Sequence, residues 1–187
     1  PVTDAWTQKN SLTGATRYDA NCFTIGSNGY VVGGYSGNFL SDLWEYNSIT
    51  DFWSQKANFP SNARSDAAAF TICDKGYYGT GEILLGASYA IDLWEYDPFT
   101  NTWIQKANFA GAGRDEPAYF SIGGKGYIGF GGEDGGPLFN DFCEYTPDIF
   151  PCIIGINEFL VSGLEFTVYP NPCNNKLTVI LSGLKNI

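Results

Sequence analysis

Carboxylates are the side chains in this chain best able to do acid–base or metal chemistry, because the sequence has 20 Asp and Glu and no histidine. Acids are adjacent at two places, Asp115-Glu116 and Glu133-Asp134. Acid–base catalysis by carboxylates needs two groups in one cleft whose pKa values are pushed apart, whereas neighbours along a strand or turn point in different directions. We therefore predict no catalytic residue and expect a protein that is not an enzyme.

Ligands for a metal ion are also scarce. The five cysteines form no CxxC pair, and without histidine a zinc site is not expected. The segment Glu133–Gly136 is acidic and rich in glycine, but it lacks the alternating oxygen ligands of a calcium loop. The sequence therefore predicts no metal site and no cofactor.

The cysteines are expected to be structural. Cys22 and Cys73 lie in apolar, strand-like runs and are predicted to be small buried side chains. Cys143 and Cys152 flank a turn-rich segment, so a local disulfide between them is one open pairing. Cys173 lies among Pro and Asn and is expected to be exposed.

The net charge of −10 is carried by residues 1–150, because residues 151–187 contain two Lys and two Glu. An acidic body argues against binding to nucleic acid, which needs a basic surface. The charge is explained by solubility, with attraction of cations or basic partners as the alternative. No apolar run approaches the ~20 residues that span a bilayer, so the chain is not expected to cross a membrane.

The elements that position these residues repeat three times. The segment Asp42–Tyr46 returns as Asp92–Tyr96 and, altered, as Asp141–Tyr145. Arginines recur with the same period, at residues 17, 64 and 114, which are 47 and 50 residues apart. A period of this length indicates a solenoid, a propeller or an array.

The second unit shows the pattern of strands best. Its strands are predicted at 67–72, 77–81, 92–96 and 102–106, with turns at 74–76 and 97–101 and a variable stretch at 82–91. Four antiparallel strands joined by hairpin-length turns make one blade of a propeller. One blade cannot bury both of its faces, so it must stack on neighbouring blades.

The units resemble kelch repeats over about residues 3–146. The likeness rests on glycines after the second strand, a tyrosine in the third and a tryptophan in the fourth: Gly33, Gly34, Gly131, Gly132, Tyr46, Tyr96, Tyr145, Trp53 and Trp103. The resemblance implies an all-β fold, a kelch-type β-propeller of three four-stranded units in residues 1–150. These framework residues are expected to be structural, and the repeated Arg and Asp or Glu to pair between blades.

The phase of the repeat predicts how a ring would close. Residues 4–9 resemble a lone fourth strand, while the third unit ends near Pro147 without one, so both ends are expected to pair in one blade. Propellers have about four to eight blades. Three units are therefore expected to belong to a longer propeller; two chains associating to build about six blades and an open array capped by a partner are the alternatives.

Residues 151–165 are predicted to be a linker, and a different pattern begins at Phe166. Two β-rich runs flank a turn formed by Tyr169, Pro170, Asn171 and Pro172. Residues 166–187 are predicted to be the start of a sorting domain, because residues 166–181 resemble the opening of the C-terminal sorting domain of proteins exported by the type IX secretion system of Bacteroidetes. The resemblance implies recognition by that machinery and a protein that is secreted or held on the outer cell surface. It covers only the beginning of that domain, and a simple terminal hairpin is the alternative.

Three connections differ while the framework repeats: Ser36–Ser41, Glu82–Ile91 and Glu133–Asn140. Variable loops on a rigid scaffold are where recognition usually resides, although drift of surface loops gives the same variability. We expect a module that binds a protein or a glycan, as in adhesion. The alternatives are a purely structural surface component and a part of a carbohydrate-active kelch enzyme, oxidase-like or epimerase-like, whose site lies outside this segment.

Overall fold

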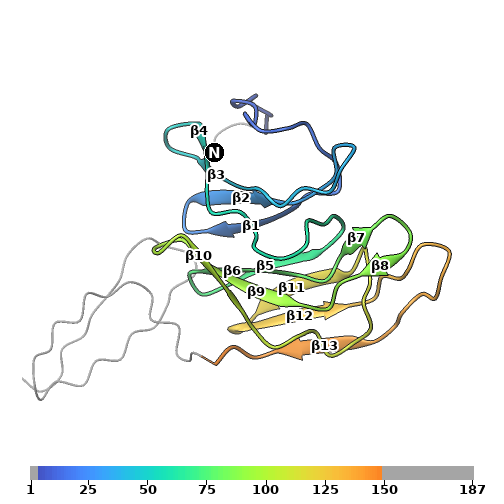
Figure 1. The fold of residues 1–187 in the computed structure, drawn as a ribbon. Helices are drawn as coiled ribbons and strands as arrows, with labels where there is room; N and C mark the ends of the chain where they lie inside the picture. Colours follow the sequence, from blue (N-terminus) through green and yellow to red (C-terminus); the bar gives the residue numbers. More distant parts are fainter. Residues whose placement is uncertain (1–3, 149–187) are drawn as a thin grey trace, which may run out of the picture. The chain divides into compact units, whose positions relative to one another are not determined.

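The computed structural model of the chain describes residues 4–148. Every regular element in that range is a β-strand, which confirms the predicted all-β class (Figure 1). The chain divides into two compact units, Pro1–Ile154 and Gly155–Ile187. The predicted linker, residues 151–165, and the sorting segment that follows it lie outside the described range of residues 4–148. No helix in the described range is long and apolar enough to cross a bilayer.

The first blade is a four-stranded antiparallel sheet. Its strands follow one another in order: β1 (Asn21–Ile25), β2 (Asn28–Val32), β3 (Leu43–Asn47) and β4 (Phe52–Gln55). The turn between β1 and β2 places Gly26 in the left-handed region, at φ 58°, where glycine lacks the penalty of a Cβ. The turn between β3 and β4 is fixed by the Tyr46 hydroxyl, which donates to Asp51 at 2.8 Å.

The second blade repeats this sheet and adds a hairpin. Its strands are β5 (Ala68–Ile72), β6 (Lys75–Gly79), β9 (Leu93–Asp97) and β10 (Thr102–Gln105), with the hairpin β7 (Glu82–Leu84) and β8 (Ser88–Tyr89) between β6 and β9. Lys75 and Gly76, which the sequence placed in a turn, begin β6. The turn sits earlier because Cys73 adopts a left-handed backbone, at φ 56°.

The third blade has three strands in the described residues: β11 (Ala118–Ile122), β12 (Lys125–Gly129) and β13 (Phe142–Tyr145). Residues 4–9, predicted to pair as its fourth strand, form no strand, and the Trp6 side chain is fully exposed at 104%. Residues 4–9 therefore form no strand in the described part of the chain, and closure of a complete ring through them stays a prediction.

Asn10 instead docks on the outer edge of the first blade. Its backbone N–H donates to Asp51 at 3.1 Å, and its carbonyl accepts from the Trp53 indole at 2.9 Å. Ala57 makes the same contact with the second blade, since its carbonyl accepts from the Trp103 indole at 2.9 Å. Asn10 thus occupies the place that follows the fourth strand of a preceding blade.

The blades stack in chain order (Figure 1), and a hydrophobic core lies at each of the two junctions. Between the first and second blades, Phe23 lies over Gly76, where an added Cβ would overlap the phenyl ring. Between the second and third blades, Phe70 lies over Gly126 in the same way. Glycine in the second strand is therefore what lets adjacent blades approach closely.

Each blade is tied together by one arginine and one aspartate. Arg17 pairs with Asp42 at 2.6 Å, and the other two pairs, Arg64–Asp92 and Arg114–Asp141, are each 2.5 Å. Each arginine precedes the first strand of its blade and each aspartate precedes the third strand of the same blade. The prediction that these charges pair between blades is wrong, because the bidentate contact closes a single sheet.

The arginine backbone, by contrast, does join neighbouring blades. The carbonyl of Arg64 accepts from the N–H of Gly34 at 2.9 Å, and that of Arg114 accepts from Gly81 at 2.8 Å. The Arg64 side chain is 1% exposed and lies over the Phe59 ring at 4.7 Å. Each of these two residues therefore holds its own blade through its side chain and the preceding blade through its main chain.

The glycines after the second strand occupy a left-handed bend. Gly34, Gly81 and Gly131 are equivalent, at φ 95°, 90° and 78°. The residues before them are Gly33, Thr80 and Phe130, at φ 67°, 59° and 59°, and each carbonyl accepts from the arginine of its blade. Gly131 is thus equivalent to Gly34 and not to Gly33. The sequence analysis matched Gly131-Gly132 with Gly33-Gly34, and this match is wrong by one residue.

The cysteines differ from their predictions. Cys22 is exposed, because it lies on a face of the first blade that no other blade covers. Cys73 is disulfide-bonded rather than a buried thiol. Cys143 carries a free thiol and packs against the second core, so the disulfide between Cys143 and Cys152 is not formed.

Arg64→Ala is expected to lower the free energy of unfolding by about 3–5 kcal/mol, because it leaves the largely buried Asp92 without its partner. Urea unfolding followed by tryptophan fluorescence measures this change. Lys9→Ala, at an exposed position, is the control and should unfold as the wild type does. Equal unfolding midpoints for the two variants would contradict the role given to Arg64.

Candidate functional site

The structure brings together two of the three variable connections. The β7–β8 hairpin lies within Glu82–Ile91, and it contacts the connection Glu133–Asn140, since the backbone N–H of Asp134 donates to the Tyr89 hydroxyl at 2.7 Å. Both lie on the same side of the stacked blades, at the right of Figure 1. The first connection, Ser36–Ser41, lines neither of the pockets that these segments form.

Two pockets open where these segments meet. The larger, of about 430 Å³, is here called the acidic pocket; it is lined by four acids, three glycines, Leu138 and Phe139, the acids being Asp115, Glu116, Glu133 and Asp134. The smaller, of about 300 Å³, lies against the hairpin residues 86–89 and is also lined by Glu133 and Asp134. The two pockets therefore share one acidic wall.

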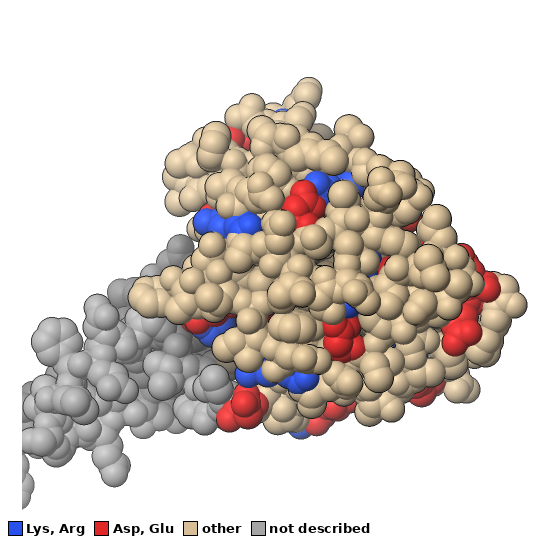
Figure 2. All heavy atoms as spheres, in the orientation of Figure 1, with Lys and Arg blue, Asp and Glu red and all other residues tan. Residues whose placement is uncertain are grey.

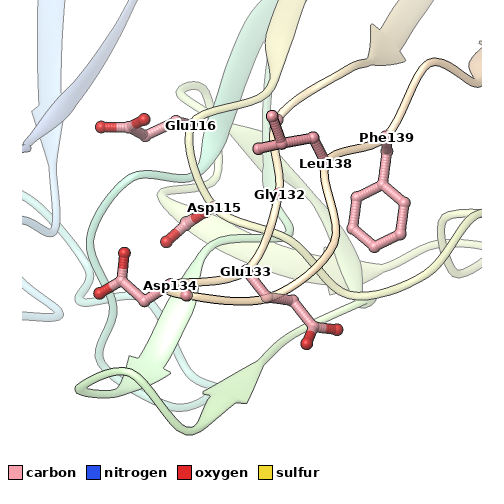
Figure 3. A pocket seen from close by; sticks show the side chains of 9 residues that line it. Asp115, Glu116, Gly132, Glu133, Asp134, Leu138 and Phe139 are labelled. Carbon is pink, nitrogen blue, oxygen red and sulfur yellow. The ribbon is translucent and has the colours of Figure 1, made fainter.

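Figure 3 shows how the acids of the larger pocket are oriented. Glu133 and Asp134 diverge, as expected for neighbours along the chain. Asp115 and Asp134 lie on the same side of the pocket although they come from different segments. The convergence is thus produced by the fold and not by the adjacent pairs that the sequence shows.

A second acidic feature, called here the acidic row, consists of Asp19, Asp66 and Glu116. Each stands two residues after its blade's arginine and has a left-handed backbone, at φ 54°, 51° and 46°. The N–H of Asp66 donates to the Asp19 carbonyl at 3.1 Å, and the N–H of Glu116 to the Asp66 carbonyl at 3.0 Å. One acid from each blade is thereby held in line across the stack.

Two of these acids, Asp115 and Asp66, have raised pKa values. Burial, followed by the charge of Asp134 and then those of Glu116 and Glu82, raises the pKa of Asp115 to about 6. Burial also raises the pKa of Asp66 to about 6, helped by the charges of the neighbouring acids and opposed by a hydrogen bond from Ser65. Both carboxyls therefore change charge near neutral pH.

No basic side chain of the described residues neutralises this surface. Arg64 and Arg114 are engaged with Asp92 and Asp141. Figure 2 shows acidic side chains grouped at the edge of the view where Figure 1 places β8 and the connection before β13, with no blue side chain among them. In the described range no group of three or more Asp, Glu, Cys or His is arranged to hold a metal ion. The arrangement suits attraction of a cationic group.

The residues singled out from the sequence lie mostly elsewhere. Gly131 and Gly132 line the acidic pocket. The other framework residues lie in strands or at bends and line neither pocket: Gly33, Gly34, Tyr46, Trp53, Tyr96, Trp103 and Tyr145. The sorting motif, Tyr169 to Pro172, falls outside the described residues.

The acidic row was missed by the sequence analysis although a signal for it exists. An acid follows each repeated arginine at the same offset of two residues, at Asp19, Asp66 and Glu116. The contribution of Tyr89 and the approach of Asp134 to Asp115 have no such signal, because they depend on contact between two blades.

Comparison with known proteins gives one match. The family model of the Kelch motif matches residues 16–60, which begin beside Arg17 and span all four strands of the first blade. A search of curated proteins finds no match to the chain. The second and third sheets repeat the strand order and the arginine–aspartate pair of the first. The chain therefore contains a kelch repeat at residues 16–60, within an all-β stack of kelch-type propeller blades.

Proposed function

We propose that this protein is a protein-binding module and that the acidic pocket, with the acidic row beside it, receives a basic segment of the partner. The kelch repeat supports a binding module built on a propeller scaffold. The observation that carries the choice of surface is the convergence of Asp115 and Asp134 between two variable segments, without a basic residue to neutralise them.

The physical basis is the field of closely spaced carboxylates. Acids within about one Debye length, ~8–10 Å at physiological salt, add their potentials at a common point. Because Asp66 and Asp115 are partly buried, their field is less screened than that of fully exposed acids. A basic segment entering the pocket would relieve the repulsion that, in addition to burial, raises both pKa values.

Replacing both Glu133 and Asp134 by the neutral amides is expected to weaken binding of a fluorescent decalysine peptide by roughly fivefold or more in about 50 mM salt, since each removed charge contributes ~0.5–1 kcal/mol. Fluorescence anisotropy measures the affinity. The matched control is Asp74→Asn, an exposed acid in the turn between β5 and β6. Loss of affinity in the control as large as in the double variant, or no change in either, would overturn the assignment of the surface. A glycan array on the same proteins tests the other class of ligand.

The binding and the stability of the protein are expected to respond to pH in opposite directions. The pKa values of Asp66 and Asp115 are raised from 3.8 to about 6, so their contribution to stability is full below about 3.8 and is lost as pH rises through about 6. Lowering the pH from about 7.5 to about 5.5 should therefore raise the Tm and weaken peptide binding. Asp42 and Asp92 have lowered pKa values and remain ionised across this window.

Thermal melts and anisotropy titrations across that range make the comparison. The double variant Asp66→Asn and Asp115→Asn should flatten both trends. A Tm that falls on acidification in the wild type, or a rise that persists in the double variant, would contradict the assignment.

We also propose that the protein is exported by a type IX secretion system and acts at the cell surface or outside the cell. The support is the likeness of Tyr169, Pro170, Asn171 and Pro172, in sequence alone, to the opening of a sorting domain. A periplasmic fluorescent reporter joined to the native chain from residue 160 onward should reach the surface or the medium in a host with the machinery. Deleting the machinery, or replacing Pro170 and Pro172 by alanine, should retain it. Retention of the native fusion in the competent host, as in the deletion strain and the proline variant, would contradict the proposal.

A further inference from the structure

The two junctions between blades are built from the same parts. In each, a phenylalanine of the first strand stacks on a tyrosine of the second strand and covers a glycine of the next blade. Phe23 stacks on Tyr30 with centroids 5.1 Å apart, and Phe70 stacks on Tyr77 at 5.5 Å. Both phenylalanines are 4% exposed. These pairs define a projecting aromatic group that fits over glycine.

The same projecting group stands uncovered on the third blade. Phe120 stacks on Tyr127 with centroids 5.2 Å apart, and the Tyr127 hydroxyl donates to Glu144 at 2.8 Å, as Tyr77 donates to Glu95. Phe120 is nevertheless 48% exposed. Ile122 and Phe142, on the neighbouring positions of this sheet, are also exposed. The third blade therefore carries the half of a junction that inserts.

The matching half stands uncovered on the first blade. Gly29 pairs with Tyr46 across β2 and β3, as Gly76 pairs with Tyr96 and Gly126 with Tyr145. An added Cβ at Gly29 would have no atom within 4 Å, whereas at Gly76 and Gly126 it would overlap a phenyl ring. The first blade therefore carries an empty half-junction of the receiving kind.

We propose that the Phe120 face of one copy of this chain packs on the Gly29 face of a second copy, head to tail. We choose a second copy as the partner because this chain carries both the inserting face and the receiving face. The two faces match the parts of the two junctions that already exist within the chain. The two faces differ, so the contact is heterologous, and such contacts close into rings when the rotation allows. This contact is independent of the acidic pocket.

Because the open side of Gly29 is empty, Gly29→Ala separates association from folding. The added methyl should leave the melting temperature of the monomer unchanged or slightly higher, yet it should block entry of the Phe120 ring. Sedimentation velocity from micromolar to about 100 µM should show a wild-type dimer, with the dissociation constant at least about tenfold higher in Gly29→Ala and in Phe120→Ala.

Phe99→Ala is the matched control, because Phe99 is an exposed aromatic in the turn between β9 and β10 and belongs to neither face. It should dimerise as the wild type does. A wild-type monomer throughout this range, dimers unaffected by Gly29→Ala and Phe120→Ala, or oligomers that keep growing with concentration would each overturn the proposal.

Discussion

A buried arginine organises each blade, and most of the other features depend on its position. Arg64 closes its own sheet by a bidentate contact with Asp92, while its backbone carbonyl accepts a hydrogen bond from Gly34 of the preceding blade. A guanidinium that is 1% exposed is tolerated only when its donors are satisfied. Arg64 meets this condition through Asp92, the Thr80 carbonyl and two further oxygens. The left-handed bend at Thr80 and the start of the third strand are thereby fixed together.

The positions of two acids of the candidate site depend on the buried arginines. Asp66 and Glu116 each follow an arginine by two residues, so fixing the arginine also fixes the acid and its left-handed backbone. Residues held in such conformations are retained where the surrounding structure over-determines them. Of the other pocket acids, Glu133 and Asp134 come from a variable connection, and the hydrogen bond between the Asp134 N–H and the Tyr89 hydroxyl joins that connection to the β7–β8 hairpin.

The repeated segments were sufficient to predict the blades, because Trp and Tyr at alternating positions leave few ways to bury a four-stranded sheet. The sequence could not predict the β7–β8 hairpin, since its two short strands lie in a stretch that matches no other unit. It also misplaced the arginine–aspartate pairs. Spacing shows that two residues recur together but not whether they meet within one blade or across two. Cys22 was predicted to be buried because alternation does not say which face of a terminal blade is covered.

The acidic row has a property that no single blade possesses. Each unit of the repeat contributes one carboxylate, and each is joined to the previous one by a backbone hydrogen bond. Each further unit of the same kind that joins the stack would add one carboxylate to this line, and its charge would also raise the pKa of the neighbouring acid, as the charges of Asp19 and Glu116 do for Asp66. A cationic partner whose charges match that line would respond to the number of blades, so its affinity would report the size of the assembly.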